Sequence, residues 1–169
     1  MNKLPPQIHS IYIAKTAGAP MEQVQQANII AGQGIAGDRY AIGTGAFSTS
    51  NPKIRHISLI TSSGIAEANQ YLEENAYDLF AESETRRNII IDHFSSDQLN
   101  ALLGKIFHLG GLAFKGVELC APCQRPANLL SRQDFMKAFD GEGGLRAEAL
   151  ESGVLLPGDS LDLSIAKLT

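Results

Sequence analysis

The chain has 169 residues, and 44% of them are hydrophobic, which is enough to bury the core of one domain. Its 14 Lys and Arg residues against 18 Asp and Glu residues leave a net charge of −4. General nucleic-acid binders and proteins that bind anionic membranes need a basic face, so this balance argues against both classes. We therefore expect one domain over residues 1–169, with neither a nucleic acid nor a membrane as its partner.

Targeting and cysteine signals are sparse. The first ten residues contain two prolines and no apolar signal-peptide segment, and no later run approaches the roughly 18 apolar residues of a membrane helix. Two cysteines are too few for a disulfide framework, or for a four-cysteine iron–sulfur cluster held by one chain. The sequence therefore predicts a cytoplasmic protein without such a cluster.

The first predicted elements are strands. β-Branched and apolar residues indicate strands over residues 7–14 and 24–30. Residues 31–51 are rich in glycine and form a predicted loop, longer than most connections and therefore a candidate for function. A strand over residues 54–61 follows, and Ser62 or Ser63 after it can cap an amphipathic helix.

The middle of the chain begins with an unusually apolar run. Three successive isoleucines within residues 87–92 predict a strand buried on both faces or inside a barrel. Ser95 or Ser96 then caps a predicted short helix, which Gly104 ends.

The last third of the chain predicts a hairpin and two further strands. Residues 105–109 and 112–119 flank a Gly-Gly turn signal. Ser131 opens a predicted short helix, and strands over residues 145–151 and 160–166 are separated by a Pro-Gly-Asp turn. Strands and helices do not alternate regularly along the chain. We therefore expect a mostly β (α+β) fold, a closed or strongly curled antiparallel β-barrel with a few short flanking helices.

Residues 32–37 match the dinucleotide fingerprint G-x-G-x-x-G, but their surroundings do not fit it. A Rossmann unit needs a helix that begins within the glycines and an acidic residue about 20 positions later. Here further glycines follow, and no Asp or Glu lies between Asp38 and Glu67. We therefore expect no NAD site, and we attribute the glycines to a turn or to a close backbone approach.

Cys120 and Cys123 form a C-x-x-C pair with two open interpretations. The four histidines lack the spacing of additional zinc ligands, and the pair lacks the βαβ context of a thioredoxin motif. The two thiols can be small buried hydrophobes. Alternatively, Arg125 can lower a nearby thiol pKa and favour a thiolate that binds metal or attacks electrophiles.

Arginines cluster around the predicted strand ends. Arginine is suited to bidentate contacts with phosphates and carboxylates. Arg86 and Arg87 precede Asn88 and the isoleucine strand, and strand alternation would leave Arg86 on the same face as Asn88. Arg146 lies among small residues and could reach an anion. The alternative is that these are solvated surface cations.

Five short motifs, taken in order, resemble the MOSC domain, the C-terminal domain of molybdenum cofactor sulfurases. They occupy residues 34–40, 86–89, 120–123, 144–147 and 152–159. Each motif is unspecific by itself, whereas their order across about residues 8–165 is specific. The resemblance implies a barrel-like fold and a pocket for the molybdopterin form of molybdenum cofactor, with no NAD or haem.

The resemblance also implies the residues of this pocket. Cys123 matches the family's key cysteine, which either ligates molybdenum or carries sulfur destined for it. The implied cofactor-binding residues are Gly37, Asp38, Arg39, Arg86, Arg87, Asn88, Arg125 and Arg146. The additional Cys120 departs from the family pattern and leaves the choice between the two cysteines open.

Two functions follow from the resemblance. The first is a molybdenum-dependent reductase of N-hydroxylated or N-oxygenated small molecules, with Cys123 as metal ligand and a separate protein as electron donor. The second is a sulfur-carrier or cofactor-binding module that receives a persulfide on Cys123 from a cysteine desulfurase. A barrel with purely structural cysteines is a third reading. The sequence favours the reductase because a soft thiolate suits a metal held by a dithiolene.

Overall fold

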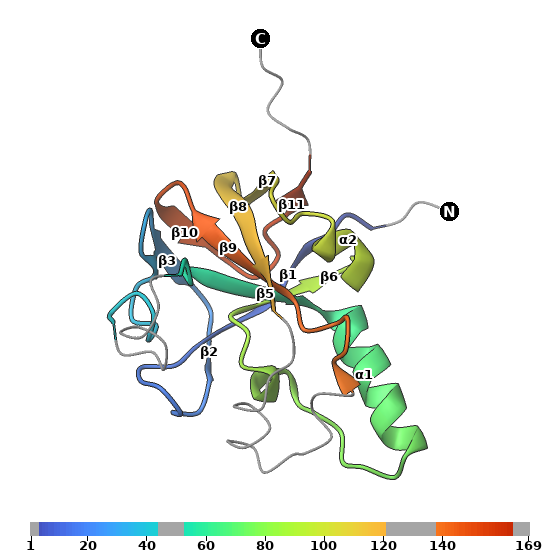
Figure 1. Cartoon of the computed structure of the whole chain (residues 1–169). Helices are drawn as coiled ribbons and strands as arrows, with labels where there is room; N and C mark the ends of the chain where they lie inside the picture. Colours follow the sequence, from blue (N-terminus) through green and yellow to red (C-terminus); the bar gives the residue numbers. More distant parts are fainter. Residues whose placement is uncertain (1–3, 44–52, 121–137, 164–169) are drawn as a thin grey trace.

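The computed structural model describes residues 4–43, 53–120 and 138–163. These residues form strands joined by short turns, together with two α-helices and one 3-10 helix (Figure 1). The strands are β1 (Gln7–Ile13), β2 (Glu22–Val24), β3 (Ala27–Ile30), β4 (Gly34–Ile35), β5 (Ile57–Thr61), β6 (Ile89–Asp92), β7 (Ile106–Leu109), β8 (Leu112–Leu119), β9 (Leu145–Ala149), β10 (Gly153–Leu155) and β11 (Leu161–Asp162). The helices are α1 (Ser62–Glu74), η1 (Glu82–Thr85) and α2 (Ser96–Asn100).

The strands form two sheets. The larger has eight strands in the order β11-β7-β8-β9-β5-β6-β1-β2, and the smaller has three in the order β10-β3-β4. The chain leaves β5 through α1 and returns in β6, so these two strands are parallel, with Leu59 opposite Ile89. The other strand pairs are antiparallel.

The expected barrel is wrong, because the large sheet is not closed. It ends at β11 and at β2, and a closed barrel requires every strand to have a partner on both sides. One isolated bridge, between Gln7 and Ser160, joins β1 to the residue before β11 without forming a ladder. The fold is therefore mixed α+β, with one open eight-stranded sheet and one small sheet.

The division into two sheets explains this error. Residues 24–30 suggested one strand, but Val24 ends β2 of the large sheet whereas Ala27 begins β3 of the small one. β10, which pairs with β3, lies between residues 151 and 160, where no strand was predicted. Eight strands were predicted where the described residues contain eleven, and local patterns do not show which strands pair.

Both sheets pack into one hydrophobic core. Ile29 and Leu155 of the small sheet are buried in the same cluster as Leu59 and Leu145 of the large one. α1 covers the opposite face at β5 and β6, and Ile90 there belongs to a second cluster. The isoleucine strand is therefore buried on both faces, as predicted.

The helix starts follow capping chemistry. Thr61, not either predicted serine, caps α1, and its hydroxyl accepts a hydrogen bond from the Gly64 amide at 2.9 Å. Ser95 caps α2 as predicted, in a reciprocal box with Gln98. The helix expected at Ser131 begins outside the described residues. No helix in the described part of the chain is both long and apolar enough to cross a membrane.

Candidate anion-binding site

Four of the five motifs meet where β5 and β9 begin and β8 ends. The register of these strands places Asn88, Ser58, Arg146 and Glu118 side by side across the sheet. We call these four residues the polar row. A bulge between Gly116 and Glu118 brings the Glu118 side of β8 into line with Arg146. The row therefore joins segments that are far apart in the sequence.

Asn88 connects the row to its neighbours through hydrogen bonds of its side-chain amide. Its Oδ1 accepts hydrogen bonds from the Ser58 amide at 3.0 Å and from the Ser58 hydroxyl at 3.1 Å. Its Nδ2 donates to the Tyr12 carbonyl at 3.0 Å and to Asp38 Oδ1 at 3.4 Å. Asn88 is buried, so it fixes the neighbouring strands to one another.

Asp38 and Arg39 form a buried ion pair behind the row. Asp38 is fully buried and accepts hydrogen bonds from the Ala14 amide and from the Arg39 guanidinium, each at 3.1 Å. The same guanidinium lies 3.5 Å from the Met21 sulfur and 4.9 Å from the centre of the Tyr40 ring. These contacts direct Arg39 into the protein. Gly37, before the pair, is exposed with a φ of +87°.

The strand alternation expected for Arg86 and Arg87 is wrong. Arg86 ends η1 with a φ of +59°, and the strand begins only at Ile89. Arg86 donates a hydrogen bond to the Ala19 carbonyl at 2.9 Å. Arg87 turns the other way, and its Nε donates to the Gly143 carbonyl at 2.7 Å. A left-handed residue interrupts the alternation on which the expectation relied.

Gly143 and Gly144 connect Arg87 to the cysteine segment. The Gly144 carbonyl accepts a hydrogen bond at 2.8 Å from the amide of Cys120, a buried residue. Gly144 has a φ of +99°, and a Cβ there would lie 2.0 Å from the Leu59 carbonyl oxygen. Only glycine fits this position without movement of the backbone. Arg87 and the start of the cysteine segment therefore lie on either side of one glycine pair.

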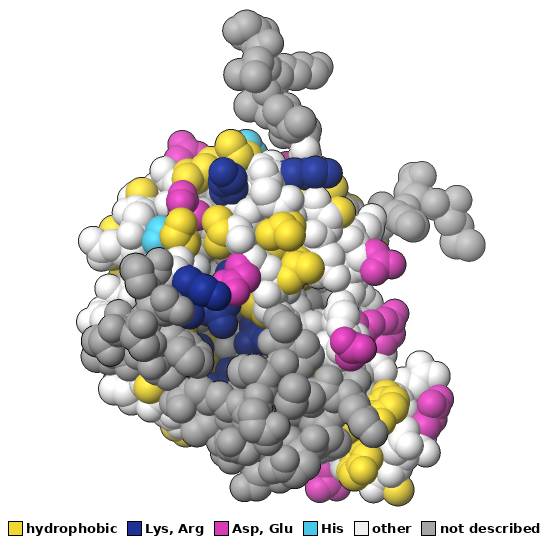
Figure 2. Space-filling model, in the orientation of Figure 1, with side chains coloured by type: hydrophobic (Ala, Val, Ile, Leu, Met, Phe, Trp, Pro, Cys, Tyr) yellow, Lys and Arg dark blue, Asp and Glu magenta, His cyan; other side chains and the backbone are white. Residues whose placement is uncertain are grey.

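Arg146 of the polar row and the neighbouring Arg87 are the two arginines of this region whose guanidinium groups are least engaged by the described residues. Among the described residues, no side chain or carbonyl pairs with Arg146 or with the terminal nitrogens of Arg87. Glu118, the one carboxylate of the row, is paired with Lys53 at 3.1 Å. Lys and Arg side chains gather in one area of this face, beside one acidic side chain (Figure 2). The site therefore presents positive charge that no side chain in residues 4–43, 53–120 or 138–163 neutralises.

The other predicted residues lie elsewhere or outside the described ranges. Cys123 and Arg125 fall within residues 121–137, which the structure does not describe. The last motif forms β10 and the turn before β11, where Asp159 accepts a hydrogen bond from the Leu156 amide at 2.9 Å. This motif serves the fold of the small sheet. Ser58 also belongs to the site, and no sequence pattern had indicated it.

The glycine fingerprint has a structural explanation. Gly34 lies in β4 with a φ of +122°, and a Cβ there would lie 2.3 Å from the His56 carbonyl oxygen. The prediction of a close backbone approach is thus confirmed.

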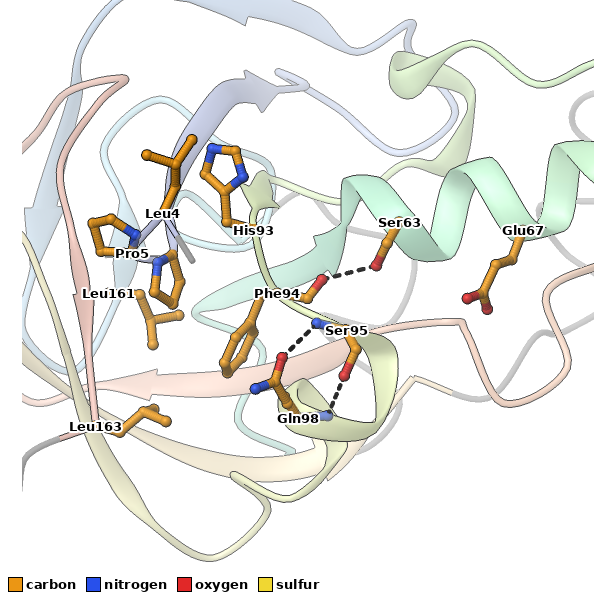
Figure 3. A pocket seen from close by; sticks show the side chains of 11 residues that line it. Leu4, Pro5, Ser63, Glu67, His93, Phe94, Ser95, Gln98, Leu161 and Leu163 are labelled. Carbon is orange, nitrogen blue, oxygen red and sulfur yellow. Dashed lines mark hydrogen bonds between the residues drawn. The ribbon is translucent and has the colours of Figure 1, made fainter. Parts of the chain in front are cut away.

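The described residues contain no metal-binding cluster, and their cavity lies apart from the candidate site. Within residues 4–43, 53–120 and 138–163, no group of three or more His, Cys, Asp or Glu side chains could hold a metal ion. A cavity of about 750 Å³ lies between the N-terminal segment, α1, α2 and the end of β11 (Figure 3). Its walls include Leu4, Glu67, His93, Phe94 and Leu161, and none of the predicted site residues.

Comparisons with known proteins agree on the fold. The family model described as "MOSC domain" matches residues 53–162. The YuaD protein from Bacillus subtilis is 18% identical, with a TM-score of 0.74, and the match covers 94% of each chain. YiiM from Geobacillus stearothermophilus is 19% identical, with a TM-score of 0.69 over 94% of this chain and 74% of that one. None of the curated protein sequences matches the chain.

Proposed function

Because the chain belongs to the MOSC domain family, we propose that it binds the molybdopterin form of molybdenum cofactor and reduces N-oxygenated small molecules. MOSC domains are associated with molybdenum cofactor. The observation that supports the binding site best is that Arg146 and the terminal nitrogens of Arg87, beside the glycine pair, have no partner among the described residues. A terminal phosphate is the kind of group that such arginines bind.

The described residues fit the proposed cofactor in charge and in rigidity. Arg87 is anchored through Nε, so its two terminal nitrogens are directed before any ligand binds. Arg146 rises from β9, whose neighbours on both sides are hydrogen-bonded strands. In this proposal Arg87 and Arg146 hold the phosphate, while Asp38, Arg39 and Asn88 keep the wall behind them in place.

Cys123 is the proposed metal ligand. Cys123 follows Cys120 by three positions in the sequence, and the Cys120 amide donates a hydrogen bond to the Gly144 carbonyl of the site. A thiolate is a soft ligand suited to a metal that already has sulfur donors. Cys120 itself is buried and has the character of a small hydrophobe.

In this proposal the cofactor, the residues of the chain and a second protein have separate roles. When bound, the cofactor would supply two-electron chemistry at its metal. The protein residues would bind the anionic end, orient the cofactor against the sheet and hold the ligand thiolate. A separate protein would deliver the electrons, and the substrate would be a small molecule.

A paired assay separates this function from sulfur transfer. Molybdenum-loaded protein is given reduced viologen and an amidoxime, and a second sample is given cysteine desulfurase with labelled cysteine. We expect reduction of the amidoxime in the first sample and no turnover with NADH or NADPH alone. No reduction in the first sample, with stoichiometric label on Cys123 in the second, would instead establish a sulfur carrier.

Substitution of each cysteine tests the assignment of the ligand. Cys123→Ser should abolish retained molybdenum, because serine does not supply a soft thiolate. Cys120→Ser should retain molybdenum and serves as the matched control. Elemental analysis of both variants decides the matter, and equal metal content in wild type and Cys123→Ser would contradict the assignment.

A further inference from the structure

A partly exposed ion pair lies beside the candidate site. Glu118 Oε1 lies 3.1 Å from Lys53 Nζ, and the two side chains keep 38% and 49% of their surface exposed. Glu118 belongs to β8, whereas Lys53 lies in the segment that leads into β5. β9, the strand that carries Arg146, lies between β8 and β5 in the sheet. The ion pair therefore joins β8 to the chain that enters β5, and these two strands flank Arg146.

Arg146 is an alternative partner for Glu118. The two residues lie directly opposite each other in the antiparallel pairing of β8 with β9. Residues in this relation point to the same face of a sheet, with Cβ atoms about 4.5–5.5 Å apart, and opposite charges there attract each other. A guanidinium can also bind a carboxylate through two parallel hydrogen bonds, which an ammonium group cannot do. Glu118 thus has two cations within reach of its side chain.

The structure shows the Glu118 carboxylate on Lys53 and not on Arg146. Among residues 4–43, 53–120 and 138–163, no ion pair joins Glu118 to Arg146, and no other carboxylate pairs with this guanidinium. An ion pair with Glu118 would occupy the Arg146 donors that an anionic ligand needs, and it would neutralise their charge. The carboxylate is therefore a competitor of the anion for Arg146.

We propose that Lys53 is a positioning residue for the anion site, because it holds the Glu118 carboxylate away from Arg146 and leaves this guanidinium open to the ligand. This inference rests on the proposed function, since the ligand of Arg146 is the anion described above. Lys53 acts through Glu118 and needs no contact with the ligand. Loss of Lys53 should therefore matter only while Glu118 carries its charge.

The positioning step can be tested without any ligand. NMR of the Arg146 Nε–H compares wild type with Lys53→Gln and with the double variant Lys53→Gln/Glu118→Gln. Lys53→Gln should shift the Arg146 signal, because Glu118 then binds this guanidinium, and the shift should be largely absent from the double variant. Lys53→Arg, which keeps a cation for Glu118, should give nearly the wild-type signal. An Arg146 signal that is unchanged in Lys53→Gln, or that shifts equally in the double variant, would overturn the inference.

The consequence for binding is tested with sulfate, by calorimetry at constant pH and ionic strength. Lys53→Gln should weaken sulfate binding about two- to fivefold, the range for partly exposed ion pairs. The loss should be much smaller when Glu118 is already Gln, and Lys53→Arg should keep most of the affinity. Lys115→Gln is the matched control and should bind sulfate as wild type does, because Lys115 is an exposed cation of β8 without an ion pair among the described residues.

The double-variant comparison separates the possible outcomes. An equal loss on removal of Lys53 with Glu118 or with Gln at position 118 would contradict the inference, because Lys53 would then act by its charge alone or contact the anion itself. Unchanged affinity in Lys53→Gln would also contradict it. Failure of every protein to bind sulfate, wild type included, would contradict the proposed function, and the NMR result would still decide the positioning role.

Discussion

Arg39 and Arg87 come from neighbouring parts of the fold but use their guanidinium groups differently. Arg39 is turned inward, where it pairs with the fully buried Asp38. The Arg87 guanidinium donates through Nε to the Gly143 carbonyl, and its terminal nitrogens have no partner among the described residues. The resemblance had grouped both as cofactor-binding residues. Both side chains are buried, so their hydrogen-bond partners are what distinguish the two arginines, and a short motif does not show those partners.

Arg39→Ala should therefore destabilise the fold. Removal of the guanidinium leaves the Asp38 carboxylate buried without its charged partner, which costs about 3 kcal/mol. Arg87→Ala should lower the free energy of unfolding by only about 1.5 kcal/mol, because it removes one charged hydrogen bond to a carbonyl and leaves no buried carboxylate without its partner. Urea unfolding of the two variants compares these values directly. Equal losses of stability would contradict the distinction.

His56 should make stability depend on pH. Its Nδ1 accepts a hydrogen bond from the Ala149 amide at 2.9 Å, and burial lowers its pKa below the ordinary value of 6.5. The unfolded chain therefore binds a proton first as the pH falls. The contribution of His56 is complete above pH 6.5 and is lost as the pH falls through the folded-state pKa.

Unfolding measured between about pH 7 and about pH 5 checks this dependence. His56→Gln, which keeps an acceptor and cannot titrate, should lose less stability over this range than wild type. His108→Gln is the control, since His108 lies half-buried on β7. A slope that is unchanged in His56→Gln would show that other groups cause the dependence.

At the scale of elements, the start of β9 is the most constrained point of the site. Gly144 passes so close to β5 that a methyl group would strike the Leu59 carbonyl. Gly141, three residues earlier, has a φ of +76° but open space around a Cβ. These two glycines allow the cost of backbone conformation to be separated from the cost of close approach.

Gly144→Ala and Gly141→Ala should therefore differ. Gly141→Ala should lose about 1 kcal/mol, the cost of a left-handed alanine. Gly144→Ala should lose about 3 kcal/mol or more, because overpacking adds to the same conformational cost. Thermal unfolding gives both values, and similar melting temperatures would show that β9 can move away from β5.

Most elements could be predicted because their signals are local. The isoleucine strand, the glycine hairpin and the capped α2 each depend on residues within about ten positions of one another. The three-residue β10 and the division of residues 24–30 between two sheets could not be predicted in this way. Both depend on which distant strand supplies hydrogen bonds, and a short strand carries no periodicity of its own.

At the scale of the whole molecule, the order of the motifs indicated the family, whereas the architecture was predicted wrongly. The arginine, cysteine and glycine motifs do converge, through bonds such as Arg87 to Gly143 and Cys120 to Gly144. The presence of Ser58 in the site could not be predicted, because its position beside Asn88 and Arg146 depends on the order of β6, β5 and β9 in the sheet. The prediction of a closed barrel was wrong for a similar reason. Closure depends on whether the two edge strands, β11 and β2, pair with each other.

Retention of molybdenum cofactor by arginine variants tests the central claim most directly. Protein made in a host that synthesises the cofactor is passed through gel filtration, and its pterin and molybdenum are measured per chain. Arg87→Ala and Arg146→Ala should each weaken retention about tenfold or more, the loss of a charged hydrogen bond. Lys115→Ala, which removes an exposed cation from β8, should retain as much cofactor as wild type. Retention in both arginine variants equal to that of Lys115→Ala would contradict the account.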